Sequence, residues 1–221
     1  PPVISSLTIS PGVIQQYNSS GLQSILDRHT MAYWKFDDGD GNTVTDETNW
    51  SWDAGTEYGP DWVTGRYGGG MEFGYDESWQ YAQAESYYHR GAEFPNGFTL
   101  ETWIYNSEAS DNSREIIRFS APYIHFYWQS DNSIRFYANS NSGSHNIYSS
   151  STLEKNKWYH VAVVIDKDVS TKLYINGVLD SQTSNGGVPS THSCCDRFGY
   201  FYGKLDEMRI STLNRSPDEF L

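Results

Sequence analysis

The sequence predicts an all-β fold, a sandwich or jelly roll built from antiparallel sheets. Short segments rich in aromatic and β-branched residues follow one another at close spacing, with Ser, Asn, Asp and Gly between them. No helical period separates these segments, and aromatic residues make up 16% of the 221 residues. Because rings and β-branched side chains pack well on a pleated surface, the pattern favours stacked sheets over helices.

Residues 1–30 are expected to lie outside the compact domain, which we predict to span residues 31–221. Residues 1–18 alternate apolar with polar side chains, as in an arm or interdomain linker, and equally as in a strand that pairs with another molecule. Ser20 and Gln23 have the spacing of a capping box, so residues 21–28 are expected to form a short helix.

Short strands are expected at intervals along the next 120 residues, each bounded by polar turn residues. A long polar loop, residues 37–50, follows the first of them. The predicted strands are residues 32–36, 71–73, 79–82, 98–104, 116–119, 123–128, 133–138 and 146–149.

The clearest local signal is a run of three strands after residue 157. Residues 158–165 are almost all aromatic or β-branched, which suits a largely buried strand. Residues 172–175 and 178–183 follow, joined by Asn176-Gly177, a pair typical of hairpin turns that need φ > 0 at both positions. This stretch predicts an antiparallel sheet.

The C-terminal part is expected to close the domain. A loop follows Gly186-Gly187 and continues to Cys195, and residues 203–210 are predicted to be the closing strand. Ser216 and Pro217 then have the pattern of a helix cap followed by the first helical position.

The formal net charge of −13 argues against nucleic acid or an anionic membrane surface as the partner. No run of 18 apolar residues is present, so we expect no membrane insertion. Asn, Ser, Tyr and Gly are abundant while Lys is sparse, which is typical of secreted or cell-surface proteins.

Nucleophilic and metal-dependent catalytic motifs are absent from the sequence. There is no Gly-x-Ser-x-Gly elbow, no His-Glu-x-x-His and no phosphate-binding glycine loop. His160 alternates with Ala162 and Val164 in a predicted strand, so we expect it to be a structural residue. The chain is therefore not expected to be an enzyme.

One predicted hairpin places polar rings on a single face. If residues 130–132 form a three-residue turn, the apolar side chains of both strands share one face. The other face then holds His125, Tyr127, Arg135 and Tyr137. Such a face offers stacking surface and hydrogen-bond donors for a sugar ring, so these residues are candidate ligand-binding residues. The alternative is that they are ordinary outer-face residues or are covered by loops.

Six segments, in order, resemble the laminin-G-like branch of the concanavalin A-like lectin/glucanase superfamily. They are residues 32–37 with 41–46, 63–74, 98–103, 157–162, 173–177 and 203–210. The resemblance extends over residues 32–221. It implies a two-sheet antiparallel jelly-roll sandwich, found mostly in secreted or surface modules that bind glycans or proteins, often with a calcium ion.

The resemblance also suggests where Ca²⁺ would bind, namely at a sheet edge where the first and last strands meet. The candidate metal ligands are Asp37, Asp76 and Asp206. Carboxylates held together in an acidic protein repel one another unless a cation neutralises them. The alternative is that Asp37 and Asp76 cap turns while Asp206 pairs with an arginine.

Glycoside hydrolysis is not expected, although glucanases share this superfamily and use two carboxylates at the scissile bond. Their motif Glu-x-Asp-x-x-Glu is absent. Glu101 stands alone, and Asp206 and Glu207 are expected to point to opposite faces of a strand.

Cys194 and Cys195 are adjacent, and in an oxidising compartment we expect them to form a vicinal disulfide. The alternatives are two free thiols or a metal site with His192 and Asp196. They precede the closing strand, where lectin-like jelly rolls often carry binding loops, so both are further candidate ligand-binding residues.

Together these features predict a secreted or cell-surface module that binds a glycan or a cell-surface protein without turning it over. One alternative is a structural subunit of an extracellular filament or surface layer, in which residues 1–18 add a strand to the next subunit. Another is an accessory domain of a larger secreted enzyme.

Overall fold

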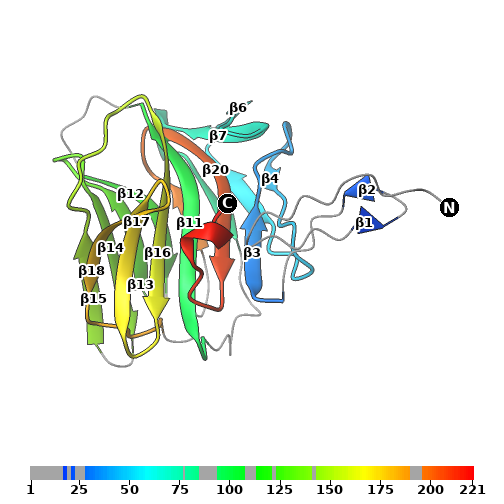
Figure 1. Cartoon of the computed structure of the whole chain (residues 1–221). Coiled ribbons are helices and arrows are strands. Elements are labelled where there is room, and N and C mark those ends of the chain that lie inside the picture. Colours follow the sequence, from blue (N-terminus) through cyan, green and yellow to red (C-terminus); the bar gives the residue numbers. More distant parts are fainter. Residues whose placement is uncertain are drawn as a thin grey trace, which may run out of the picture.

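The computed structural model describes residues 17–18, 21–22, 28–76, 78–84, 94–107, 113–120, 123–140, 143–189 and 196–221. These residues form two large antiparallel sheets packed face to face (Figure 1). The predicted two-sheet sandwich is therefore confirmed. No helix of the described part is both long and apolar enough to cross a membrane.

We call the sheet that contains the predicted ligand face sheet I. Its strands, in spatial order, are β15 (Gly143–Tyr148), β14 (Ile134–Ser140), β13 (Tyr123–Trp128), β12 (Arg114–Ser120), β19 (Asp196–Gly199), β10 (Tyr81–Ala84), β5 (Ala54–Glu57) and β4 (Thr43–Val44).

Sheet II is the other layer, and its outer face is turned toward the viewer in Figure 1. Its strands, in spatial order, are β18 (Val178–Thr183), β17 (Ser170–Ile175), β16 (Trp158–Asp166), β11 (Gly97–Asn106), β20 (Gly203–Ser211), β7 (Gly69–Phe73) and β6 (Asp61–Thr64). In addition, β3 (Thr30–Trp34) pairs with β20. The remaining elements are the pairs β1 (Tyr17–Asn18) with β2 (Gly21–Leu22) and β8 (Tyr75–Asp76) with β9 (Ser78–Trp79), and the 3-10 turn η1 (Pro217–Glu219).

Aromatic rings fill the space between the two sheets. Trp34 and Phe36 are fully buried, and both contact Phe198, with ring centroids 5.3 and 5.7 Å apart. Phe126 and Phe136 face each other across the β13–β14 pair, with centroids 6.3 Å apart. Each buried ring of this kind contributes about 1.5 to 3 kcal/mol relative to an exposed one.

The predicted hairpins form with the predicted turns. Asn176 and Gly177 have φ of 51° and 76°, as a two-residue turn between β17 and β18 requires. At the C-terminus the backbone N–H of Ser216 donates to the Glu219 carboxylate at 2.9 Å, so the capping pair is present. The element that it begins is a single 3-10 turn.

The expected helix at residues 21–28 does not begin where predicted, because Gly21–Leu22 pairs with Tyr17–Asn18 as a strand. The capping pattern expresses a local preference only, and Gly is a poor helix former. Residues 23–27 of this predicted helix lie outside the described residues, as do residues 1–16 of the predicted arm.

Candidate functional site

The outer face of sheet I carries a row of polar side chains that crosses six strands. The register of β13 and β14 pairs His125 with Tyr137 and Tyr127 with Arg135, as predicted from the three-residue turn. Direct partners continue the row on both sides. From β15 to β10, the row consists of Asn146, Tyr137, His125, Arg118, Arg197 and Gln83.

The four predicted ligand residues lie together on this face. The intervening residues of β13 and β14 point inward, and Ile124, Phe126 and Phe136 are each at most 2% exposed. Alternation therefore places His125, Tyr127, Arg135 and Tyr137 outward, where each is half-buried. Their role in binding a ligand stays a prediction.

Arg135 organises one end of the face. Its guanidinium lies 5.4, 5.7 and 5.5 Å from the ring centroids of Tyr127, Tyr137 and Tyr148. Its Nε donates to Asn146 Oδ1 at 2.8 Å. Cation–π contacts of this kind hold rings in place. The result is a surface of rings with polar edges.

His125 lies at the centre of this end of the face. Its ring stacks on Tyr127 with centroids 5.7 Å apart, and its Nδ1 contacts both the Glu115 carboxylate and, at 3.0 Å, the Tyr127 hydroxyl. Burial and the neighbouring Glu115 charge raise the pKa of Tyr127 to about 12. Tyr127 therefore keeps its proton at neutral pH and can donate a hydrogen bond.

A second ring cluster lies toward the other edge of sheet I, and the sequence analysis did not find it. Tyr81 and Tyr200 stack with centroids 5.0 Å apart and an interplanar angle of 6°. The Arg197 guanidinium lies 4.9 Å from the Tyr81 centroid, and its Nε donates to Gln83 Oε1 at 2.6 Å. Tyr81 and Gln83 alternate with alanine, which is a local signal for β10, but residues 196–199 show no such alternation.

The second predicted site, the candidate calcium site, lies at the turn between β6 and β7. Asp37 Oδ1 accepts from the Gly69 N–H at 2.6 Å. Asp206 Oδ2 accepts from the backbone N–H groups of Arg66 and Tyr67 at 2.7 and 2.8 Å. One short loop, residues 65–69, thus contacts both carboxylates.

Glycine is required in this loop by close approach. A Cβ added to Gly68, which has φ of +67°, would lie 2.4 Å from Asp37 Oδ1. A Cβ on Gly65 would lie 2.7 Å from Asp206 Oδ2 and closer still to the Gly69 carbonyl. The loop can therefore approach both carboxylates only because side chains are absent.

Asp206 has an unused oxygen in a place that water does not reach. The residue is fully buried, and its Oδ1 has no hydrogen-bond partner among the described residues. Burial, together with the charges of Glu207 and Asp37, raises the pKa of Asp206 to about 7, against the lowering effect of the backbone N–H groups of residues 66 and 67. An anionic carboxylate here is costly unless a cation joins it.

Asp76 is the third predicted calcium ligand. Only its backbone is described, in β8, so its side chain cannot be placed relative to Asp37 and Asp206. Within the described residues, no group of three His, Cys, Asp or Glu side chains converges as a metal site would require. The alternative for Asp206 was a pair with an arginine, and Arg66 contacts Asp206 through its backbone N–H. Cys194, Cys195 and His192 lie outside the described residues.

The expectation that Asp206 and Glu207 point to opposite faces is wrong. The β11–β20 register shifts between Glu101 and Trp103, and Glu207 has φ of +50°. Such a bulge breaks the alternation of side chains. Asp206 contacts the 66–67 backbone, and Glu207 accepts a hydrogen bond from Tyr33 on the same outer side of sheet II.

Glu101 is a buried structural carboxylate, and it is fully inaccessible. Its Oε1 accepts from Arg209 at 2.5 and 2.8 Å, and its Oε2 lies 3.0 Å from His160 Nε2. Burial alone would raise the pKa of Glu101, but the hydrogen bond from His160 and the Arg209 charge lower it below its usual range. His160 is buried and bonded, in agreement with the prediction of a structural residue.

Comparison with known families gives one match over most of the chain. A family model described as the concanavalin A-like lectin/glucanases superfamily matches residues 76–220. No curated protein sequence matches the chain.

Solved structures with a similar fold include toxin binding domains and one domain of an arabinanase. The binding domain of Paraclostridial Mosquitocidal Protein 1 has 14% identity and a TM-score of 0.70, covering 86% of this chain and 50% of that one. The botulinum neurotoxin serotype G binding domain has 14% identity and a TM-score of 0.66, covering 86% and 49%. The chain thus spans about half the length of these toxin domains.

Domain 4 of AbnA, a GH43 extracellular arabinanase from Geobacillus stearothermophilus in complex with arabinotriose, has 16% identity and a TM-score of 0.69. The match covers 86% of this chain and 96% of that domain. At these identities the likeness concerns the fold alone.

Proposed function

We propose that this chain, which belongs to the concanavalin A-like lectin/glucanase superfamily, is a non-catalytic module that binds a glycan on the outer face of sheet I. The observation that carries the proposal is the cluster in which Arg135 spans three tyrosine rings beside His125. Flat rings with a few polar groups at their edges are the usual composition of a carbohydrate site.

The extent of the face favours a chain of sugars over a single ring. Neighbouring strands lie about 4.8 Å apart, so a row across six strands extends over about 24 Å. The Arg135 cluster lies at one end of this row and the stacked Tyr81 and Tyr200 at the other. Several sugar units in line can therefore contact both clusters.

The surroundings of Glu115 on this face, and of Glu101 in the other sheet, favour binding without hydrolysis. Glu115 is held by His125, and Arg118 lies 3.9 Å from its other oxygen. Glu101 is buried in sheet II under Arg209 and His160. Neither is placed as one of two carboxylates on either side of a scissile bond.

Glycan-array binding tests the proposal at its central residue. Tyr127→Ala is expected to lower binding at least tenfold, because it removes the ring that stacks on His125 and lies under Arg135. Trp50→Ala is the matched control, since Trp50 is 64% exposed and lies in the loop between β4 and β5. Unchanged binding by Tyr127→Ala, with a melting temperature equal to that of the wild type, would remove this face from the proposal.

Calcium stabilisation is the second part of the proposal. Asp37 and Asp206 would supply carboxylate oxygens, which are the ligands that Ca²⁺ prefers, and the buried Oδ1 of Asp206 is available for this role. Asp76 is proposed as a third ligand. Asp37 already pairs with Lys35 at 2.7 Å, so a bound ion would neutralise chiefly Asp206 and would fix the 65–69 loop. Calorimetry on EDTA-treated protein should detect Ca²⁺ binding and a higher melting temperature, and the absence of both would end this part.

A secreted or cell-surface location completes the proposal, and it is supported by the extracellular arabinanase and the toxins among the similar structures. Cys194 and Cys195 would then form a vicinal disulfide and contribute to a binding loop. Mass spectrometry that finds two alkylatable thiols without reductant would contradict the disulfide.

The second candidate function is an accessory domain of a larger secreted enzyme. The observation that favours it is the match to 96% of domain 4 of the arabinanase, a domain whose structure contains arabinotriose. Binding to the polysaccharide substrate of such an enzyme, on the same face of sheet I, would separate this role from recognition of a cell-surface glycan.

A further inference from the structure

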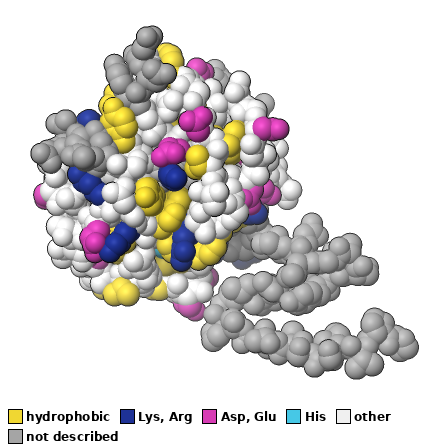
Figure 2. Space-filling view, turned by 90° about the horizontal axis from the view of Figure 1, so that it is seen from above, with side chains coloured by type: hydrophobic (Ala, Val, Ile, Leu, Met, Phe, Trp, Pro, Cys, Tyr) yellow, Lys and Arg dark blue, Asp and Glu magenta, His cyan; other side chains and the backbone are white. Residues whose placement is uncertain are grey.

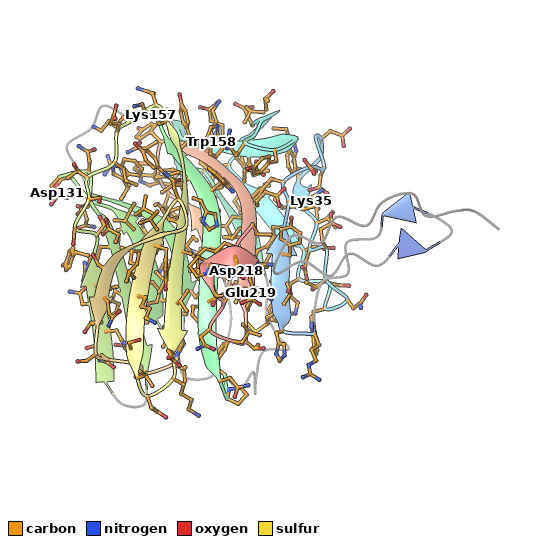
Figure 3. The ribbon with its side chains drawn as sticks, viewed as in Figure 1. Lys35, Asp131, Lys157, Trp158, Asp218 and Glu219 are labelled. Carbon is orange, nitrogen blue, oxygen red and sulfur yellow. The ribbon has the colours of Figure 1, made fainter. Side chains whose placement is uncertain are left out.

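The outer face of sheet II, on the opposite side of the sandwich, holds a cavity of about 440 Å³. Ligand sites usually have volumes of about 300 to 1,000 Å³. Figure 3 shows Trp158 at the upper end of β16 and, lower on the same face, Asp218 and Glu219 of η1. The residues that line the cavity include Arg66, Trp103, Trp158, His160 and Phe220.

The walls of the cavity are held by specific contacts. The C-terminal segment crosses sheet II, where the Arg209 guanidinium donates to the Glu219 carbonyl at 2.6 Å. Phe220 packs against His160 and Tyr174, with ring centroids 5.5 and 5.3 Å apart. The opposite wall is the 65–69 loop, which Asp206 fixes through the backbone of Arg66 and Tyr67. The cavity is therefore formed before any ligand arrives.

The charged side chain that lines the cavity is a cation, Arg66. Arg66 is exposed, and its guanidinium lies 4.8 Å from the Trp103 ring centroid. The Trp103 Nε1–H is buried and has no acceptor among the described residues. The nearest buried carboxylate, Glu101, already accepts from Arg209, His160 and the Leu221 N–H. A ligand that pairs with Arg66 must therefore supply the acceptor itself.

Aromatic surface and one cation define the ligand further. Trp158 is half-buried at the upper end of the cavity, and its ring packs beside Tyr105 with centroids 5.5 Å apart. A tryptophan ring next to a guanidinium suits a molecule with a flat apolar face and a carboxylate, because guanidinium–carboxylate hydrogen bonds are strong and directional. A sugar ring that bears a carboxylate has both features.

We propose that this cavity is a second binding site, which takes the terminal acidic sugar of a glycan. In this arrangement the sugar ring packs on Trp158, and its carboxylate pairs with Arg66, whose guanidinium lies beside the Trp103 ring. The site is independent of the face on sheet I, since the two lie on opposite sides of the sandwich.

The test uses ¹⁵N-labelled protein and monitors the tryptophan indole N–H signals. The probes are glucuronate and N-acetylneuraminate, with glucose as the neutral match and acetate as the bare carboxylate. Saturable shifts of the Trp103 and Trp158 signals are expected with at least one acidic sugar, at an affinity at least tenfold above that for glucose and for acetate. Shifts with neither acidic sugar, or equal affinity for glucose or acetate, would overturn the proposal.

Two variants assign the effect to the cavity. Arg66→Gln is expected to lower affinity for the acidic sugar at least tenfold, and Trp158→Ala to abolish the saturable shift of Trp103, each with a wild-type melting temperature. Arg66→Gln that binds as tightly as wild type would overturn the proposal. Tyr127→Ala, on sheet I, should leave these titrations unchanged, so failure of this site and failure of the sheet I face give different results.

Discussion

At the scale of single residues, Glu101 is a completely buried carboxylate, and a buried charge needs charged or hydrogen-bonding partners. A fully buried carboxylate is tolerated because Arg209 and His160 contact it directly. The same contacts hold the C-terminal segment, since Arg209 also bonds to the Glu219 carbonyl and Glu101 to the Leu221 N–H. One carboxylate therefore links three strands to the segment that crosses them.

Glu101→Gln is expected to lower the free energy of unfolding at pH 7 by about 3 to 5 kcal/mol, because it leaves a buried Arg209 without its charge partner. The folded-state pKa of Glu101 is lowered, so its stabilisation is present above the ordinary pKa of 4.5 and is lost as the pH falls through the folded-state value. Denaturant unfolding of both proteins between pH 3 and pH 7 should give a difference that shrinks below pH 4.5.

Glu154→Gln is the matched control for this series. Glu154 pairs with Lys157 at 2.6 Å, but both side chains are more than half exposed. Exposed ion pairs contribute little to stability. A difference between wild type and Glu101→Gln that stays constant from pH 7 to pH 3 would contradict the assigned role of the carboxylate charge.

Substitutions at two glycines distinguish backbone strain from steric contact with Asp37 at the proposed calcium site. Gly68 and Gly41 have φ of +67° and +78°, but a Cβ on Gly68 would strike Asp37 whereas one on Gly41 meets nothing within 4 Å. Gly41→Ala is expected to cost about 1 to 2 kcal/mol, the penalty of a left-handed backbone. Gly68→Ala should cost more and, in titration calorimetry, weaken Ca²⁺ binding. Equal losses in both variants would mean that the contact with Asp37 does not matter.

At the scale of elements, the sequence was informative where a strand is long and its turn has a specific chemistry. The register of β13 and β14 follows from the three-residue turn, and the β17–β18 hairpin from Asn176-Gly177. Alternation then determines which side chains point outward. This is why four of the predicted ligand residues do lie on one face.

Short strands and irregular pairing were not predictable in the same way. β5 and β19 have four residues each, and they are held by neighbours distant in the chain: Ala82 pairs with both Thr56 and Phe198. The bulge at Glu207 depends on packing against β11 rather than on local sequence. The Tyr81 and Tyr200 cluster and the cavity under η1 both arise from such long-range contacts, so the sequence alone did not reveal them.

The importance of β19 to the core is testable at Phe198. Phe198 is fully buried and contacts Trp34 and Phe36 from across the sandwich, so Phe198→Ala should cost about 3 to 5 kcal/mol by leaving a cavity. The neighbouring Arg197 points outward, and Arg197→Gln should change glycan binding more than stability. Thermal unfolding and glycan retention of both variants check this. Equal destabilisation by the two substitutions would contradict the inward and outward alternation of β19.

At the scale of the whole molecule, net charge and local charge act differently. The net charge is −13, yet Figure 2 shows Lys and Arg side chains beside apolar ones on the upper end of the sandwich, with Asp and Glu around them. Surface charges more than about 8 Å apart are largely screened at physiological ionic strength. Arg66 and Arg135 can therefore attract an acidic or polar ligand locally, although the chain as a whole would repel a nucleic acid.

The rival role, assembly into a filament or layer through residues 1–18, makes a prediction at the same scale. In Figure 1 the β1–β2 pair lies outside the sandwich, while the chain joins sheet II through β3. The first described contacts with sheet II are those of His29, whose carbonyl accepts from the Thr212 N–H, and of Thr30 in β3.

A protein that begins at residue 28 should therefore keep its melting temperature and its retention on a polysaccharide resin, because both proposed glycan sites use residues after Asp37. Light scattering of the full chain should show a monomer at all concentrations. Scattering that rises with concentration and disappears in the shortened protein would instead favour assembly, and loss of retention in that protein would contradict the placement of the binding sites on the sandwich.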